Sequence, residues 1–442
     1  MKNKRSFKES FFVFLQVAAY SFGGPANQIA VMHRLLVDEK KWINEKQFLN
    51  ALNYCMLLPG PEAHQLIIYI GWVLHGVLGG VVAGILFVLP GFLSILILSI
   101  LYVNYQTTDA VNIIFYGIKP AVIAIVLSAL IRIGKKALKS PILQVIALSA
   151  FIALFFFNVP FPIIIVSTAL IGYLLNRYNL VYSTDNEKKF SQATYTISFS
   201  PVELIKTFSI WITIWLLPVF GIFIIMGAHH VFTQEALLFS KTAVLSFGGA
   251  YAVLSYIAQQ AVQTYGWLKP AEMLDGLGMA ETTPGPLIQV VQFVGFLAAY
   301  RHAGELNPLL AGLIGSIITT WVTFVPSFLW IFIGAPYIEQ FRKIKALHAI
   351  LNAITAAIVG VILNLSLWFA INTLFAKVNK VQIFIFDTYQ PIWSSFDVGS
   401  ALIMLITLVL TFRYKAGIFS VLLTGIILGS LLSIPAVSGV LP

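Results

Sequence analysis

Long apolar runs separated by short polar stretches cover most of this chain of 442 residues. A helical segment needs roughly 20 apolar residues to cross about 30 Å of hydrocarbon, and these runs approach or exceed that length. The pattern therefore predicts an all-α polytopic membrane protein. The clearest runs are residues 81–103, 110–131, 141–157, 161–175, 208–227, 309–333, 346–375 and 398–412.

Near the N-terminus the apolar segments are shorter and are interrupted by glycine and proline. Segments of 12 to 17 residues reach only about 18–25 Å as helices, which is less than a full crossing. Proline removes a backbone donor and clashes with the preceding turn, so each motif should stop a helix. Each unit is then a helix, a break and a helix, either a re-entrant hairpin or one interrupted span. Segments 11–22 and 25–37 flank "GGP", and segments 44–58 and 62–78 flank "PGP".

The second half of the chain repeats the first. When "SFGG" at 21–24 is aligned with "SFGG" at 246–249, "PGP" at 59–61 falls on "PGP" at 284–286 without a gap. Internal repeats of this kind are typical of secondary transporters. With small offsets the alignment continues through "YIGW" 69–72 with "FVGF" 293–296, "FVLPGFL" 87–93 with "TFVPSFL" 323–329, and "IKPAVIAIV" 118–126 with "ITAAIVGVI" 354–362.

Lysine and arginine mark opposite ends of equivalent helices in the two halves. In the first half they follow the 110–131 helix, as Arg132, Lys135, Lys136 and Lys139. In the second half they precede the equivalent helix, as Arg342, Lys343 and Lys345, and the loop after it is long and only mildly charged. Because positive loops remain cytoplasmic, the two repeats should have inverted topology.

A single helix at roughly 203–228 has no counterpart in the repeat. It would reverse the orientation of the second half in the membrane. We therefore expect an N-terminal repeat at 1–176, a cytoplasmic linker plus an extra transmembrane helix at 177–235, and an inverted C-terminal repeat at 236–442. The N-terminus should be cytoplasmic and the C-terminus outside.

Composition supports a membrane protein and excludes several functions. Hydrophobic residues make up 59% and charged residues 10%, whereas soluble proteins carry about 25% charged residues. The net charge of +10 is explained by cytoplasmic loops, so we expect no nucleic-acid partner. The single cysteine, Cys55, excludes an internal disulfide and a multi-cysteine metal site. There is no Walker loop, no His/Cys metal spacing and no nucleophile–His–acid arrangement, which argues against an enzyme, a cofactor or a bound metal.

The breaks are the expected substrate site. Non-helical backbone survives at membrane depth only where it is buried in protein or lines a watery cavity, and a helix that starts there presents free N–H groups to an anion. The alternative is that the motifs are tight turns at the membrane surface. The candidate substrate-binding residues are Gly23, Gly24, Pro25, Asn27, Gln28, Pro59, Gly60, Pro61, His64, Gln65, Lys119, Gly248, Gly249, Thr282, Thr283, Pro284, Gly285, Pro286 and Gln289.

Glu62 and Glu281 lie beside the two PGP motifs. A carboxylate inside a bilayer costs about 2.5–3.5 kcal/mol even on lenient scales, so both are candidates for proton coupling. Alternatively, each caps a helix or pairs with a basic residue. They are not equivalent in the repeat, since Glu62 opens one helix and Glu281 closes another.

Other polar residues leave two interpretations open. His64 and His33 could carry protons or bind substrate, or could simply be hydrogen-bonded. Lys119 interrupts a long apolar helix, and it either snorkels to the surface or supplies positive charge to an anion cavity.

The motifs closely resemble the chromate transporter family. The resemblance is carried by "SFGGPANQIAVMHRLLV", "FLNALNYCMLLPGPEAHQLIIYIGW", "HGVLGGVVAGILFVLPG" and "MLDGLGMAETTPGPLIQVVQFVGF", and it covers both halves. It implies the long-chain, two-domain form of a cytoplasmic-membrane protein that exports chromate, driven by the proton motive force, and so confers chromate resistance. Glutamine is common in the family pattern at the place of His64, which weakens an essential proton role for that residue.

The residues alone indicate only a small anion, and an oxyanion is the best candidate. The alternatives are a sulfate or related oxyanion permease and, from another class, a membrane-embedded enzyme acting on lipid. The expected partners are chromate or a sulfate-like oxyanion, protons and the lipid bilayer, and a homodimer is one assembly left open.

Overall fold

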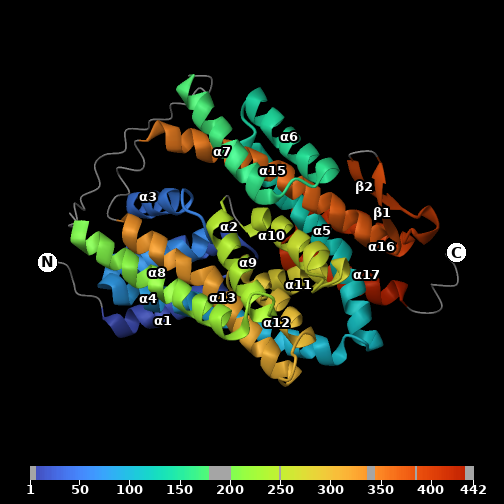
Figure 1. The fold of residues 1–442 in the computed structure, drawn as a ribbon, viewed down its shortest axis with the longest axis horizontal. Helices are drawn as coiled ribbons and strands as arrows, with labels where there is room; N and C mark the ends of the chain where they lie inside the picture. The colour runs from blue at the N-terminus through green and yellow to red at the C-terminus, as the bar shows by residue number, and fades with distance from the viewer. Residues whose placement is uncertain (1–5, 179–200, 248–249, 336–343, 384–385, 434–442) are drawn as a thin grey trace. The chain divides into compact units, whose positions relative to one another are not determined.

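The computed structural model describes residues 6–178, 201–247, 250–335, 344–383 and 386–433, and these residues are predominantly helical (Figure 1). Two predicted site residues, Gly248 and Gly249, lie outside the described residues. So do most of the predicted linker, the C-terminus, and two of the positive residues used for orientation, Arg342 and Lys343.

Five of the described helices are long and apolar enough to cross a membrane. They are α4 (Glu62–Tyr105), α5 (Asp109–Ala137), α8 (Pro201–Met226), α13 (Pro308–Gly334) and α15 (Lys345–Leu374). Shorter apolar helices accompany them, namely α6 (Pro141–Phe157), α7 (Phe161–Arg177), α16 (Val398–Phe412) and α17 (Ile418–Leu432). The prediction of a helical polytopic membrane protein is confirmed.

Helix α4 contains a sharp reversal. His75 and Gly76 leave helical geometry, and Gly76 has a φ of 68°. Gly71 and Gly79 come so close that a Cβ atom on Gly71 would lie 2.4 Å from the carbonyl oxygen of Gly79. Residues eight apart in a straight helix would lie about 12 Å apart, so the chain turns back on itself here. The two predicted segments, 62–78 and 81–103, are therefore separate arms of α4.

Every motif whose flanking residues are described stops a helix. Ser21–Gly24 separates α1 from α2, and residues 56–61 separate α3 from α4. In the second half, residues 283–286 separate α11 from a single 3-10 turn, η3 (Leu287–Gln289), which leads into α12. The helices concerned are α1 (Phe7–Tyr20), α2 (Pro25–His33), α3 (Glu45–Cys55), α9 (Val231–Leu245), α10 (Ala250–Ala258), α11 (Pro270–Thr282) and α12 (Val290–Arg301).

The repeat is visible in the element boundaries. With the two SFGG motifs aligned, α2 coincides with α10 residue for residue. A π-helical stretch then follows at equivalent positions in each half, as η1 (Arg34–Glu39) and η2 (Gln259–Thr264). The later helices match in order, with α5, α6 and α7 corresponding to α15, α16 and α17. Helix α8 has no counterpart, as expected for the single helix at roughly 203–228.

A β-hairpin follows α15 where the sequence analysis expected only a long loop. Strand β1 (Val378–Ile383) pairs antiparallel with β2 (Phe386–Pro391), and Val378 lies opposite Pro391. Only the end of β1, "KVQI", alternates polar and apolar residues as a half-buried strand does. A search tuned to long apolar runs misses so short an alternation.

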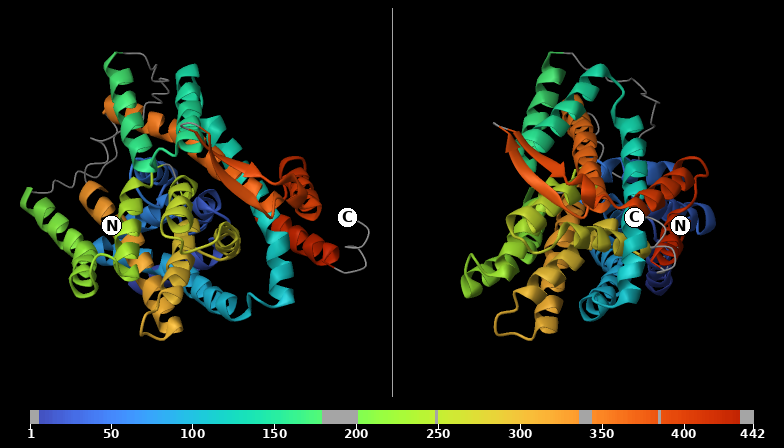
Figure 2. Two further views of the ribbon diagram at one scale, coloured as in Figure 1. Left: turned by 45° about the vertical axis from the view of Figure 1, so that its right-hand side comes forward. Right: turned by 90° about the vertical axis from the view of Figure 1, so that its right-hand side faces the viewer.

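The chain divides into two compact units, and each unit takes segments from both halves. Unit 1 comprises residues 1–96, 169–253 and 283–351, and unit 2 comprises 97–168, 254–282 and 352–442. In unit 1, α13 packs against α12, α9 and α8. In unit 2, α5 packs against α17, α16 and α11, and Figure 2 shows α17 beside α5 in both views.

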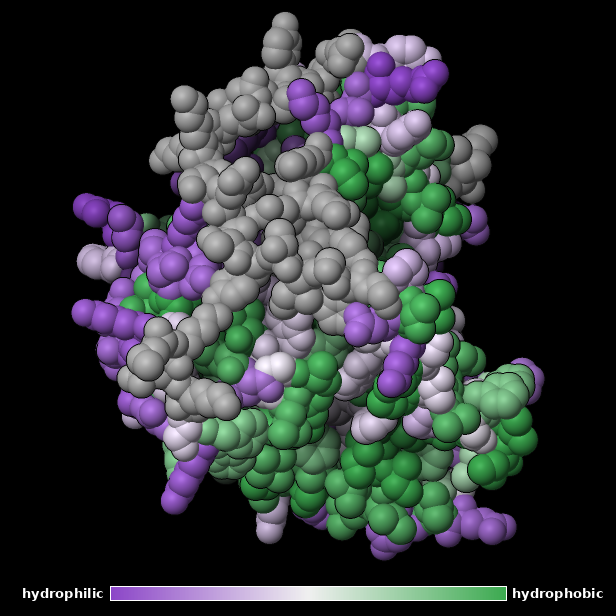
Figure 3. Space-filling model, turned by 90° about the vertical axis from the view of Figure 1, so that its left-hand side faces the viewer, coloured by the Kyte–Doolittle hydropathy of each residue, from purple (hydrophilic) through white to green (hydrophobic). Residues whose placement is uncertain are grey.

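Much of the described surface is apolar. On the face drawn in Figure 3, hydrophobic residues form a broad continuous area with hydrophilic residues gathered at its edges. Helix α8 is the clearest case, because Leu217, Phe220 and Ile225 are 62%, 60% and 77% exposed. Such a surface suits hydrocarbon rather than water.

Candidate functional site

Two equivalent backbone hydrogen bonds join the broken helices of the two halves. The N–H of Gly60 donates to the carbonyl oxygen of Ser246 at 3.0 Å. The N–H of Gly285 donates to the carbonyl oxygen of Ser21 at 2.8 Å. Gly60 and Gly285 are repeat equivalents, as are Ser21 and Ser246, so each half offers the other the same donor and the same acceptor. This reciprocity is typical of a local two-fold relation between the halves.

Glycine is required at the centre of both PGP motifs. Gly60 has a φ of 127° and Gly285 a φ of 100°, which side chains rarely allow. The second motif also packs tightly against α4, because a Cβ atom on Gly91 would lie 2.6 Å from the carbonyl oxygen of Pro284. The prolines stop the helices, and the glycines let the two breaks approach neighbouring backbone.

The side chain of Gln28 contacts the break of the other half, whereas that of Asn27 does not. The Nε2 atom of Gln28, which is 1% exposed, donates to the carbonyl oxygen of Gly285 at 2.6 Å. Asn27 is exposed, and its Nδ2 atom donates to the carbonyl oxygen of Phe22 within its own break. The first GGP motif is therefore tied to the second PGP motif through a side chain as well as through backbone.

Buried glutamines hold the PGP breaks. Gln65 donates to the carbonyl oxygen of Pro59 at 2.7 Å. Gln289 donates to Gln292 at 2.7 Å, and Gln292 donates to the carbonyl oxygen of Phe92 at 2.9 Å. The sequence predicted Gln65 and Gln289 as donors to substrate, but here their N–H groups serve the protein. Gln289 could bind an oxyanion by exchanging these bonds, and Gln65 by exchange or through the second N–H of its amide.

A small cavity opens beside the first PGP motif within unit 1. Gly60 and Pro61 line it together with Thr242, Ser246 and Thr323. The hydroxyl of Thr323 has no hydrogen-bond partner in the described part of the chain. The described residues that line this cavity include no charged side chain, so hydroxyl and backbone groups supply its polarity.

The two predicted acids lie where the sequence placed them along their helices. Glu62 is the first residue of α4 and is half-buried. Glu281 lies in the last turn of α11 and is 1% exposed. Glu62 belongs to unit 1 and Glu281 to unit 2, and their proton-coupling role stays a prediction.

His64 lies in apolar surroundings. It is fully buried, and its ring lies 5.1 Å from that of Phe324 and 5.4 Å from that of Phe328, measured between centroids. It also lines a cavity of about 430 Å³ whose other walls are largely apolar residues of α4, α8 and α13. These neighbours offer little to a hydrated dianion.

His33, the other histidine considered, lies in a charged cluster at the end of α2. Its ring nitrogens face the carboxylates of Asp38 and Glu45. Burial alone would lower the pKa of His33, but hydrogen bonds and charges from Glu45 and Asp38 outweigh burial and raise the pKa above its ordinary value of 6.5. The ring is positioned to carry a positive charge that the two acids stabilise.

Lys119 is paired with an acid that sequence reasoning missed. Its Nζ atom lies 3.5 Å from Oδ1 of Asp275, which is 3% exposed. Tyr102 donates to the other carboxylate oxygen of Asp275 at 2.9 Å. The charge of Lys119 is therefore balanced within unit 2. Applying to Asp275 the rule used for Glu281 would have found it, since both acids lie in the same apolar helix.

Glu235 is a second overlooked acid. It lies in α9, is fully buried, and neither of its carboxylate oxygens has a hydrogen-bond partner in the described part of the chain. One oxygen packs against Gly315 of α13, because a Cβ atom added to that glycine would lie 3.1 Å from it. A buried carboxylate without hydrogen-bond partners is costly in its ionised form.

The chain is similar to chromate transporters along most of its length. A sequence model of the family described as "Chromate transporter" matches residues 8–173 and 233–430. A chromate transport protein of Pseudomonas aeruginosa is 32% identical over 363 residues, which are 81% of this chain and 79% of that protein. A chromate transport protein of Cupriavidus metallidurans is 28% identical over 351 residues, covering 79% of each chain.

A shorter relative matches a smaller part of the chain. An uncharacterized transporter of Bacillus subtilis is 31% identical over 140 residues, which are 31% of this chain but 70% of that protein. The stretch between the two regions matched by the family model contains α8, the helix without a counterpart. No solved structure matches the chain.

Proposed function

Because this chain belongs to the chromate transporter family, we propose that it carries chromate across the cytoplasmic membrane and that the direction is export. The family is one of transporters rather than enzymes. The observation that carries the proposal is the family match over both halves, and these halves meet through the reciprocal Gly60–Ser246 and Gly285–Ser21 bonds.

The membrane potential supports export over uptake. With the inside negative, each charge of a dianion leaving the cell gains roughly 2.3 kcal/mol per 100 mV. Uptake of the same ion would run against this field and would need coupled cations. Export therefore needs no ATP-binding element in the chain.

Substrate binding is proposed at the helix breaks of unit 1. The first N–H groups of α2 and α4 lack intrahelical acceptors because each helix begins directly after a break, so these groups can meet an anion. Gln28, Gln65 and Gln289 would contribute N–H groups by exchanging their present acceptors for oxyanion oxygens. Because protein bonds are exchanged for substrate bonds, occupancy and the geometry of the breaks would change together.

Proton coupling is assigned to Glu62, with Glu281 as the second candidate. Two unit charges about 6 Å apart at an effective dielectric near 20 repel by roughly 2.8 kcal/mol, and a divalent partner doubles this. Glu62 would therefore be protonated when the dianion is bound and ionised when the site is empty. One proton would then leave with each dianion, and the net charge of −1 would still let the membrane potential drive export.

Chromate content of cells tests the function. Cells without exporters of their own that express this chain should accumulate less radiolabelled chromate than vector controls and should survive higher chromate concentrations. Higher chromate content would overturn export and favour the alternative of an oxyanion permease. In that case labelled sulfate content should rise as well.

A further inference from the structure

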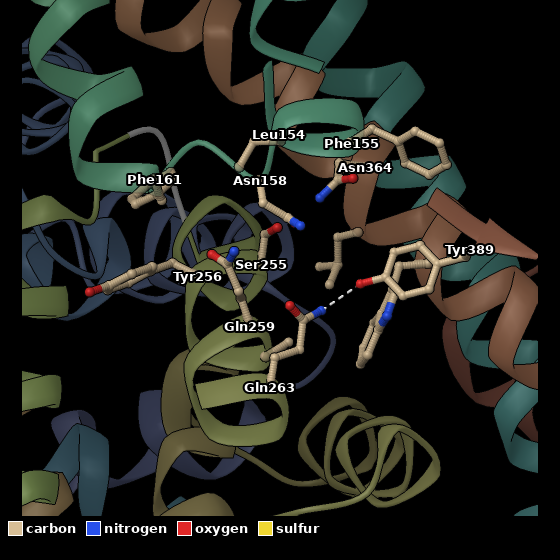
Figure 4. Close-up of a pocket in the computed structure, with 13 residues that line it drawn as sticks. Leu154, Phe155, Asn158, Phe161, Ser255, Tyr256, Gln259, Gln263, Asn364 and Tyr389 are labelled. Atoms are coloured by element: carbon tan, nitrogen blue, oxygen red, sulfur yellow. Dashed lines mark hydrogen bonds between the residues drawn. The ribbon is translucent and has the colours of Figure 1, made fainter. Parts of the chain in front are cut away.

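A second polar pocket lies within unit 2. In Figure 4 the side chains of Asn158 and Asn364 point toward one another, and Ser255, Gln259 and Gln263 lie around the same space. They come from the end of α6, from α10, from η2 and from α15. Tyr256 of α10, Trp368 of α15 and Tyr389 of the β-hairpin complete the polar part of the lining. We name this site the amide pocket.

Several donors in the amide pocket are not engaged by the protein. Gln263 donates to the hydroxyl of Tyr389 at 2.7 Å. The side chains of Gln259, Asn364 and Ser255 make no hydrogen bond within the described part of the chain, although Ser255 is only 7% exposed. Polar groups in such positions normally find a partner, so these donors are available to a ligand.

The π-helical stretch η2 differs in charge from its equivalent in the first half, η1. Gln259 opens η2, and its equivalent in the first half is Arg34, which opens η1 and lies 3.5 Å from Glu39. The first-half π-helical stretch is thus occupied by internal ion pairs, whereas η2 carries neutral amides. π-helical turns are often found at functional sites. None of the described residues lining the amide pocket is charged, so the pocket has no carboxylate to repel an anion.

We propose that the amide pocket is an oxyanion-binding site that takes a tetrahedral dianion of the chromate or sulfate type. Amide N–H and hydroxyl groups supply the hydrogen bonds, with Gln259, Asn364 and Ser255 as the primary donors. The choice of this ligand class rests on the proposed function. Binding by neutral donors is weaker than binding by a full positive charge, which allows the release that transport requires.

Equilibrium binding of radiolabelled sulfate to the purified full chain in nanodiscs tests the site. Gln259→Glu and Asn364→Asp keep side-chain size but add a carboxylate, and each should weaken sulfate binding at least tenfold. Gln260→Glu is the matched control, because Gln260 lies in the same η2 but does not line the pocket. The control should bind like the wild type. Elution of all variants as single species would show that they are folded.

Two results would overturn the amide pocket as an oxyanion site. One is unchanged sulfate binding in both pocket variants, and the other is an equal loss in Gln260→Glu, which would indicate a general charge effect. The outcome is separable from that of the proposed function. If cells fail to export chromate while the two pocket variants alone lose sulfate, the transport proposal fails and the site stands.

Discussion

Single acidic residues in apolar helices are the main candidates for function. Their positions could be predicted from sequence because a charged residue stands out in an apolar run, as Glu62 and Glu281 do. Their partners could not, because pairing depends on which helices pack together. The Lys119–Asp275 pair joins α5 and α11, which are more than 100 residues apart in the sequence.

The Lys119–Asp275 pair gives a prediction about stability. Asp275→Asn should leave the partly buried ammonium group of Lys119 without its counter-charge and destabilise the protein by about 2 kcal/mol. The double variant Lys119→Met, Asp275→Leu should recover most of this loss, because it removes both charges together. Thermal unfolding in detergent measures both. An Asp275→Asn protein as stable as the wild type would show that the pair does not hold the helices.

The His33 cluster gives a pH prediction. The folded-state pKa is raised, so protonated His33 stabilises the fold fully below pH 6.5, and this contribution is lost as the pH rises through the higher folded value. Hydrogen exchange of residues 25–55 should therefore be faster at pH 8 than at pH 6. Amide exchange is also intrinsically faster at higher pH. In the variant His33→Gln, the difference between pH 8 and pH 6 should shrink to this intrinsic effect. Equal pH sensitivity in the variant would refute the role of His33.

At the scale of elements, sequence patterns located the helices well. Helices α6 and α16 begin and end where the apolar runs predicted, because a helix in hydrocarbon must satisfy its own backbone along the whole run. The breaks could also be predicted, because glycine and proline interrupt the backbone hydrogen bonds of a helix. The β-hairpin was missed, as was the unengaged amide of Gln259 in η2, because neutral side chains give no signal until neighbours are known.

Gly285→Ala tests the geometry of the breaks. The residue has a φ of 100° and lies against Gly91, so alanine should cost about 1–3 kcal/mol and disturb the bond to Ser21. Chromate transport should fall at least tenfold. Gly221→Ala is the control, because nothing lies within 4 Å of a Cβ atom at that position of α8. Equal transport by both variants would contradict a functional role for the break.

At the scale of the whole molecule, the reciprocal bonds of the breaks support a two-fold relation, and the charge pattern predicts that its axis lies in the membrane plane. The inversion therefore remains a prediction from loop charges. Tags at residue 190 and at the C-terminus should be labelled from opposite sides of the membrane in intact cells. Labelling of both from the same side would mean that the halves are parallel.

The central claim is that the chain moves chromate as a charged species coupled to Glu62, and chromate efflux from proteoliposomes tests it most directly. Vesicles loaded with chromate carry a potassium gradient, and valinomycin sets the interior negative. Wild-type vesicles should release chromate several-fold faster with the potential than without it, and faster still as the interior is made more acidic. Glu62→Gln should keep the response to potential and lose the response to pH. Efflux equal to that of protein-free liposomes, or equal with and without the potential, would contradict the account.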